Sequence, residues 1–198
     1  MLAVMSLTLY ACEKEDFLEE NVNPDIPERE LYSTEKQGVI TKLYQVKMRR
    51  ELMIPFSAYV MQVDNRDYLY MIRLRFNQDL KIGNVIDYSV STYCPNEIVK
   101  INDFCFGECE NANQNVNDGS SGYLVATDPI ETEIKNIFSM QVAYSVTFLP
   151  IQTLFIETTE GNLVFIKKSK VNIPLVVGDK IVYSRYTLYD ELLMLKKL

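Results

Sequence analysis

The sequence predicts an all-β protein that contains two tandem copies of one small module. The segment 81–89, Lys-Ile-Gly-Asn-Val-Ile-Asp-Tyr-Ser, returns at 176–184 as Val-Val-Gly-Asp-Lys-Ile-Val-Tyr-Ser. In each copy a glycine turn precedes residues whose apolar and polar side chains alternate, which is typical of a half-buried strand. No convincing long amphipathic helix pattern occurs elsewhere. These observations indicate a duplicated β-module.

The repeat extends upstream and downstream of the glycine turn without a gap. At an offset of 95 residues, identical residues occupy the pairs Pro55/Pro150, Asn77/Asn172, Leu80/Leu175, Gly83/Gly178, Ile86/Ile181, Tyr88/Tyr183, Ser89/Ser184 and Thr92/Thr187. Unrelated sequences of this composition match at roughly one position in fifteen. The duplication therefore predicts that Gly83 and Gly178 lie at equivalent turns, and that Tyr88 and Tyr183 lie in equivalent strands.

Short runs of strand-forming residues separated by turn residues give the expected elements. In the first copy the predicted strands are 38–48, 54–63, 68–76, 85–92 and 98–101. In the second copy they are 132–138, 142–148, 153–158, 163–171, 180–188 and 192–195. The segments 64–67 and 159–162 are predicted hairpin turns. Residues 133–138 and 189–197 are also compatible with short helices.

About five strands per copy, with a Leu-x-x-Gly-Asn/Asp turn before the fourth, resemble the OB-fold, a small Greek-key barrel. Gly38-Val39-Ile40 as the opening strand and the turn 80–84 carry this resemblance. Two immunoglobulin-like sandwiches are the alternative, because they also use short alternating strands. The expected organisation is a signal segment at 1–11, a tether at 12–31, module 1 at 32–109, a linker at 110–121 and module 2 at 122–198.

The N-terminal segment has the features of a lipid-anchor signal. Residues 1–11 form a short apolar run that ends at Cys12, and Leu9-Tyr10-Ala11-Cys12 resembles a bacterial lipobox. The resemblance implies that residues 1–11 are removed and that Cys12 is acylated. The run is too short to span a bilayer, and it ends at a small residue as a signal segment does. The alternative is that residues 1–9 form a buried strand.

The residues after Cys12 are acidic: Glu13-Lys14-Glu15-Asp16 is followed by Glu19 and Glu20. This cluster resembles the export signal that follows the lipidated cysteine in surface lipoproteins of Bacteroidetes-type bacteria. It is equally compatible with a solvated tether, which the prolines at 24 and 27 would continue. The expected location is the outer membrane, with the protein attached through lipid at Cys12 and exposed at the cell surface.

Composition argues against several classes of function. The formal net charge of −7 and the pI of about 4.8 disfavour a nucleic-acid-binding protein, because such proteins depend on excess Lys and Arg. The chain has no histidine, which is the commonest general base and the commonest zinc ligand. The sequence contains no phosphate-binding glycine loop and no nucleophile elbow. We therefore expect neither catalysis nor a cofactor.

Two further groups of residues are candidate sites. Cys94, Cys105 and Cys109 could include one disulfide in an oxidising compartment, and a three-cysteine zinc site is the weaker alternative. The segment 113–119, Asn-Gln-Asn-Val-Asn-Asp-Gly, has the spacing of a calcium loop but offers a single carboxylate. Its composition favours a linker between the modules.

A basic stripe is the one patterned candidate for ligand binding. In the strand predicted at 68–76, Arg73 and Arg75 share one face, because strand side chains alternate. Lys168 and Lys170 are predicted at the equivalent positions of the second copy. The resemblance to the OB-fold implies that this strand belongs to the usual ligand platform. The alternative is an ordinary solvated outer face.

These features predict a non-catalytic binding or assembly protein of the bacterial envelope. Its partners would be other outer-membrane or surface proteins, or an anionic glycan that contacts the basic stripe. An envelope hydrolase that uses carboxylates is the alternative, and it would require a pocket with two carboxylates about 5 to 10 Å apart.

Overall fold

The computed structural model describes residues 33–49, 55–72, 79–102, 104–105, 125–144 and 149–198. These residues form strands with almost no helix, as the sequence predicted. The strands of the first module are β1 (Lys36–Arg49), β2 (Pro55–Val63), β3 (Asp67–Ile72), β4 (Val85–Val90), β5 (Ile98–Ile101) and β6 (Phe104–Cys105). Those of the second are β7 (Ile130–Val142), β8 (Ile151–Thr158), β9 (Leu163–Lys167), β10 (Lys180–Arg185) and β11 (Leu192–Lys197), with the 3₁₀ turn η2 (Lys168–Lys170) after β9.

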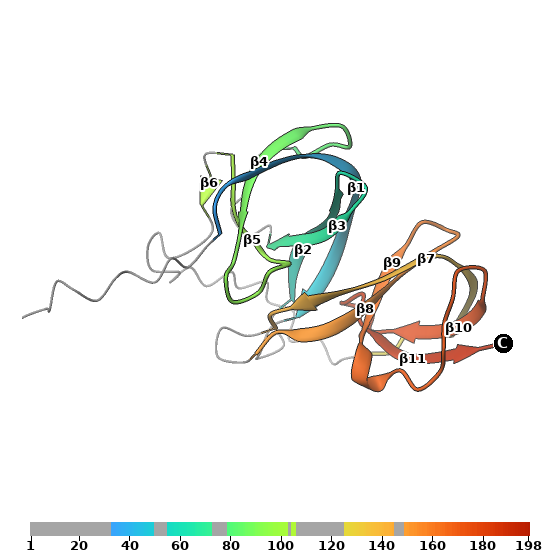
Figure 1. Ribbon diagram of the computed structural model, residues 1–198. Helices are drawn as coiled ribbons and strands as arrows, with labels where there is room; N and C mark the ends of the chain where they lie inside the picture. Colours follow the sequence, from blue (N-terminus) through green and yellow to red (C-terminus); the bar gives the residue numbers. More distant parts are fainter. Residues whose placement is uncertain (1–32, 50–54, 73–78, 103, 106–124, 145–148) are drawn as a thin grey trace, which may run out of the picture.

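The two modules have the same topology. The first sheet has the order β3-β2-β1-β4-β5-β6, and the second has the order β11-β10-β7-β8-β9. The second order is therefore the first one in reverse, apart from the additional β6. Every pairing between neighbouring strands is antiparallel. Figure 1 shows the first module, β1 to β6, above the second, β7 to β11, with the two in contact.

Each module closes as a small barrel. The long first strand pairs with two neighbours and has a β-bulge, between Ile40 and Lys42 in β1 and between Ile134 and Asn136 in β7. A parallel bridge then joins the third strand to the start of the fifth, at Tyr70↔Glu97 in the first module. The equivalent bridge in the second module is Phe165↔Glu191. This order and this closure match those of a five-stranded Greek-key barrel such as the OB-fold.

The repeated turn and strand are equivalent, as predicted. Gly83 and Gly178 have φ values of 90° and 89°, which side chains with a Cβ rarely adopt. The Gly83 N–H donates to the Ile40 carbonyl at 2.8 Å, and the Gly178 N–H donates to the Ile134 carbonyl at 2.8 Å. Ile40 and Ile134 are 94 residues apart, so the offset changes by one residue between the first strand and the turn.

The strands that follow these turns are also equivalent. Ile86 and Ile181 are 1% and 0% exposed, and both lie in the strand after the turn. Tyr88 pairs with Ile101, and Tyr183 pairs with Leu195, in the same topological position. The duplication inferred from the sequence is therefore confirmed in the fold.

Several predicted elements need correction. Residues 130–142 form one strand, β7, so the break predicted between residues 138 and 142 is wrong; residues 145–148 of the strand predicted at 142–148 lie outside the described residues. β7 also contains a bulge between Ile134 and Asn136, which breaks the alternation of apolar residues. The strand predicted at 163–171 ends at Lys167, and η2 begins at Lys168. Residues 189–197 contain β11 and no helix.

Other expectations lie outside the described residues. These are the signal segment and tether at 1–31, the linker at 110–121 and the end of the strand predicted at 68–76. The two sheets lie within the expected modules 32–109 and 122–198.

Gly38 lies where the strand β1 and the β2–β3 turn approach each other closely. A Cβ atom at this residue would lie 2.3 Å from Cγ1 of Val63 and 2.8 Å from Oδ2 of Asp64. Asp64 also binds this strand directly, since its Oδ1 accepts the Val39 N–H at 2.8 Å. The opening Gly38-Val39 therefore allows β1 to approach the β2–β3 turn closely.

The described residues form three hydrophobic clusters. One fills the first barrel, and it includes Ile40, Met61 and Tyr88. The second fills the second barrel with the residues at equivalent positions, Ile134, Ile156 and Tyr183. The third cluster contains residues from both modules. Two modules that share a core in this way form one packed body.

Candidate functional site

The junction between the modules is built from equivalent faces of the two barrels. Val46 and Met48 of β1 pack with Met140 and Val142 of β7 in the third cluster. The cluster is completed by strand and loop residues of both modules: Ala58, Val60, Tyr70, Cys94, Ala143, Phe155, Leu163 and Phe165. The paired positions recur across the interface, as in a two-fold dimer whose two subunits are joined in one chain. The strands in contact across this junction are β1 with β9 and β3 with β7, and Figure 1 shows the lower ends of β1 and β2 reaching the second module.

Reciprocal hydrogen bonds show the same symmetry. Oδ1 of Asn96 accepts the backbone N–H of Gln141 at 2.9 Å. Oδ2 of Asp190 accepts the backbone N–H of Lys47 at 2.7 Å. Asn96 and Asp190 are equivalent, because their carbonyls bind the N–H groups of Tyr70 and Phe165 at the two closing bridges. Each module therefore binds the other through the loop between its fourth and fifth strands.

This packing covers the surface that an OB-fold most often uses for ligands. That surface comprises the second and third strands together with the loop between the fourth and fifth strands. Here Val60 and Tyr70 of the first module face the other module, as do Phe155 and Phe165 of the second. Ligand binding by either module in the usual manner would require the junction to open.

Charged pairs border the apolar junction. Glu191 is 3% exposed at its side chain, and Nε of Arg49 donates to its Oε2 at 2.7 Å. The Arg49 guanidinium lies 5.2 Å from the ring centroid of Tyr186, in cation–π geometry. Arg185 pairs with Asp190, the residue that also binds Lys47. These pairs link β1 to the loop between β10 and β11.

A second charged cluster surrounds Glu157, whose side chain is 6% exposed. Its oxygens accept hydrogen bonds from Lys135 Nζ at 2.8 Å and from the Tyr44 hydroxyl at 2.8 Å, and Lys42 Nζ lies at 3.9 Å. Burial alone would raise the pKa of Glu157, but these partners outweigh it and lower the pKa. Burial and the bond to Glu157 raise the pKa of Tyr44. Since Lys42 and Tyr44 belong to β1, ionised Glu157 holds the two modules together.

This cluster predicts a pH dependence of stability. A lowered carboxyl pKa stabilises the folded state above the ordinary value near 4.5, and the stabilisation is lost as the pH falls through the folded-state pKa. The free energy of unfolding of the wild-type protein should fall between pH 6 and pH 3.5, as measured by urea titration. It should fall less in the variant Glu157→Gln. Glu131→Gln, at an exposed position on β7, is the control and should keep the wild-type profile. A Glu157→Gln profile that superimposes on wild type would contradict this role.

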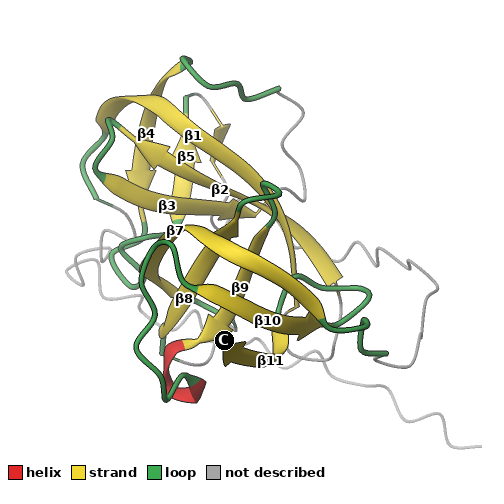
Figure 2. Cartoon of the chain, turned by 90° about the vertical axis from the view of Figure 1, so that its right-hand side faces the viewer, coloured by secondary structure: helices red, strands yellow, loops and turns green. Residues whose placement is uncertain are grey.

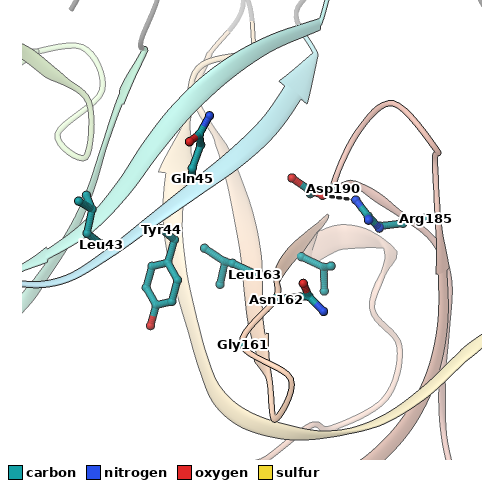
Figure 3. Close-up of a pocket in the computed structure, with 9 residues that line it drawn as sticks. Leu43, Tyr44, Gln45, Gly161, Asn162, Leu163, Arg185 and Asp190 are labelled. Carbon is teal, nitrogen blue, oxygen red and sulfur yellow. Dashed lines mark hydrogen bonds and ion pairs between the residues drawn. The ribbon is translucent and has the colours of Figure 1, made fainter. Parts of the chain in front are cut away.

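A cavity of about 270 Å³ opens beside these pairs. Its walls are the β1 residues 43–45, the residues 161–164 at the start of β9, and the Arg185–Asp190 pair. Figure 3 shows Arg185 and Asp190 on one side of the cavity and Tyr44 and Gln45 on the other. The cavity is polar and partly open, and its charged residues are paired with each other. This arrangement suits a small polar group or a side chain of a partner.

The cavity lies where the two halves of the junction differ in side-chain size. At the equivalent place in the other half, Tyr68 stacks on Phe138 with ring centroids 3.5 Å apart. The residues equivalent to this pair are Leu163 and Tyr44, which line the cavity. Leucine at position 163 leaves space that the Tyr68 ring fills on the other side.

The structure does not place the predicted basic stripe on two equivalent strands. Arg73 and Arg75 lie outside the described residues. Lys168 and Lys170 lie on η2 and not on the face of a strand, so their predicted placement is wrong. Both lysines are exposed, next to Lys167, whose Nζ lies 5.3 Å from the ring centroid of Tyr144. A ligand-binding role for the four residues stays a prediction.

The predicted cysteine chemistry is resolved for one residue. Cys94 is a free thiol with 0% exposure at the junction, and its Sγ lies 3.5 Å from both the Tyr70 hydroxyl and the Gln141 carbonyl. Burial is the main reason that its pKa is raised. Cys12 and Cys109 lie outside the described residues, as does the segment 113–119. Within the described ranges, no group of three His, Cys, Asp or Glu side chains could hold a metal ion.

The residues that form the junction were not predicted from the sequence, although one signal was present. Residues 58–61 (Ala-Tyr-Val-Met) and 154–156 (Leu-Phe-Ile) are continuous apolar runs. Such runs indicate strands that are buried on both faces, and β2 and β8 are buried in this way. No local sequence pattern indicated that Glu157 and Glu191 form ion pairs at the junction.

Comparisons of this chain with protein-family models, with curated proteins and with solved structures found no match. In the part of the chain that the structure describes, no helix is long and apolar enough to cross a membrane.

Proposed function

We propose that this chain is a non-catalytic binding or assembly protein of the bacterial envelope, attached to the outer membrane through lipid on Cys12. Leu9-Tyr10-Ala11-Cys12 and the acidic residues after it support the attachment. Several acyl chains on one cysteine would make the attachment firm, because a single chain binds a bilayer only weakly.

The observation that carries the binding role is the pairing of charges around the cavity. Asp190 is engaged by Arg185 and by the Lys47 N–H, and Glu191 is engaged by Arg49. Carboxylates held in this way serve the junction between the modules. A general acid or base instead needs a carboxyl group that is available to exchange a proton with a substrate. The geometry therefore favours a rigid two-module scaffold that presents surfaces to a partner.

Cys12→Ala tests the attachment. The protein produced in a bacterial host with lipoprotein export should move from the membrane pellet to the soluble fraction, because the variant lacks the acylated thiol. Cys94→Ala is the matched control, since Cys94 lies buried in the junction, and it should stay in the pellet. Cys12→Ala protein that still sediments with membranes after a carbonate wash would refute the anchor. Partners that co-purify with the lipidated form, and their identity, test the binding role.

A further inference from the structure

The C-terminal strand β11 forms a border of the second sheet. The Leu198 N–H donates to the Lys180 carbonyl of β10 at 2.9 Å. Because alternate residues of a strand face the same neighbour, Leu195 and Lys197 direct their backbone N–H and C=O groups away from β10. The Phe165↔Glu191 bridge places β9 beside the beginning of this side, and within the described part of the chain no strand pairs with it from Leu195 to Lys197. Figure 2 shows β11 at the lower border of the sheet, below β10.

In the first module, a further strand pairs with the edge that is equivalent to the outer edge of β11. Ile101 of β5 is equivalent to Leu195, since these residues pair with Tyr88 and Tyr183 at the same topological position. In the first module the outer side of β5 is covered by β6, which pairs antiparallel through Ile101↔Phe104. Asn102, with a φ of 49°, turns the chain into β6. At the equivalent position in β11, Lys196 continues the strand to Lys197.

The side chains along this edge indicate the chemistry of an added strand. Leu193 is 42% exposed, and the side chains of Met194 and Leu195 are half-buried. Lys180, Lys196 and Lys197 lie at the other end, where Asp179 pairs with Lys197 at 2.7 Å and Glu133 of β7 lies opposite Lys180. The edge therefore combines an apolar stretch with surplus positive charge in an otherwise acidic chain.

We propose that the outer edge of β11 binds an extended, acidic segment of a partner protein by antiparallel strand addition. The backbone groups of Leu195 and Lys197 pair with the segment, its apolar side chains cover Leu193 and Met194, and its carboxylates contact Lys196. An exposed edge of this kind is otherwise a site of unwanted association, which lysines reduce. The inference rests on the proposed binding role for the existence of a partner, but it is independent of the lipid anchor.

The test uses the full-length Cys12→Ala protein and an end-blocked seven-residue peptide of alternating Glu and Val. On peptide binding, hydrogen exchange at the amides of Leu195 and Lys197 should slow at least tenfold, whereas the Lys196 amide, which faces β10, should change little. The same peptide with Lys in place of Glu should bind at least fivefold more weakly. No change in exchange at millimolar peptide, or protection at another edge, would overturn the proposal. Equal binding of the two peptides would overturn the assignment of an acidic partner.

Two matched pairs of variants test the contact itself. Leu195→Pro removes the outward N–H and should raise the Kd of the acidic peptide about tenfold relative to Leu195→Ala, which loses the same side-chain packing. Lys196→Glu should raise the Kd about fivefold, whereas Lys36→Glu, on an exposed position of the first module, should leave it unchanged. Equal affinities within both pairs would refute the site. Failure of the membrane-release experiment would instead affect only the anchor.

Discussion

Phe155→Ala is expected to destabilise the whole protein by about 3 to 5 kcal/mol, the usual cost of deleting a buried phenylalanine ring. Phe155 has 0% exposure, and its ring lies 5.3 Å from that of Phe138 and 5.6 Å from that of Phe165, centroid to centroid. It belongs to the cluster shared by the two modules. The loss should therefore weaken the first module as well as the second.

Chemical denaturation monitored by circular dichroism and by tyrosine fluorescence gives the measurement. Both signals should shift together to lower denaturant, in one transition. Leu149→Ala is the control, because Leu149 is 75% exposed and its loss should change stability by less than about 0.5 kcal/mol. If about half of the signal change of Phe155→Ala occurred at the wild-type midpoint, the two modules would unfold independently.

Arg49→Ala is expected to cost about 3 kcal/mol, because it leaves the carboxylate of Glu191 buried without its cation. Removal of both partners should cost less. The double variant Arg49→Met/Glu191→Leu should recover most of the stability, since apolar residues of similar volume often replace a buried ion pair without loss.

Lys100→Ala is the control for Arg49→Ala. Lys100 pairs with Glu35 at 3.0 Å, but both side chains are substantially exposed, so the change should cost less than about 1 kcal/mol. The experiment is a double-mutant cycle measured by urea titration. Equal costs for Arg49→Ala and Lys100→Ala would mean that the Arg49–Glu191 pair does not stabilise the junction.

The sequence predicted the elements whose cause is local. The turns at Gly83 and Gly178 need a positive φ, and Ile86 and Ile181 follow them at the same spacing in strands of period two. Each of these features depends on a few neighbouring residues, so the repeat and the order of most strands could be inferred. The bulge in β7 could not, because one extra residue inverts the alternation on which strand prediction depends.

The candidate site could not be predicted because its contacts are remote in sequence. Tyr44 binds Glu157 across 113 residues, and Arg49 binds Glu191 across 142 residues. The partners come together only when the two barrels pack through equivalent faces. The basic stripe illustrates the limit of inference from the repeat: Lys168 and Lys170 occupy the expected sequence positions, but the chain has left the strand there.

The rate at which Cys94 reacts with a thiol reagent tests most directly whether the two modules form one body. Substitution of Cys12, Cys105 and Cys109 leaves Cys94 as the single thiol of the chain. Cys94 belongs to the first module and contacts Gln141 of the second, whereas Phe155 belongs to the second. In this background, Phe155→Ala should accelerate labelling of Cys94 by a factor on the order of one hundred or more, which corresponds to the expected destabilisation. A labelling rate that Phe155→Ala leaves unchanged would contradict the shared junction.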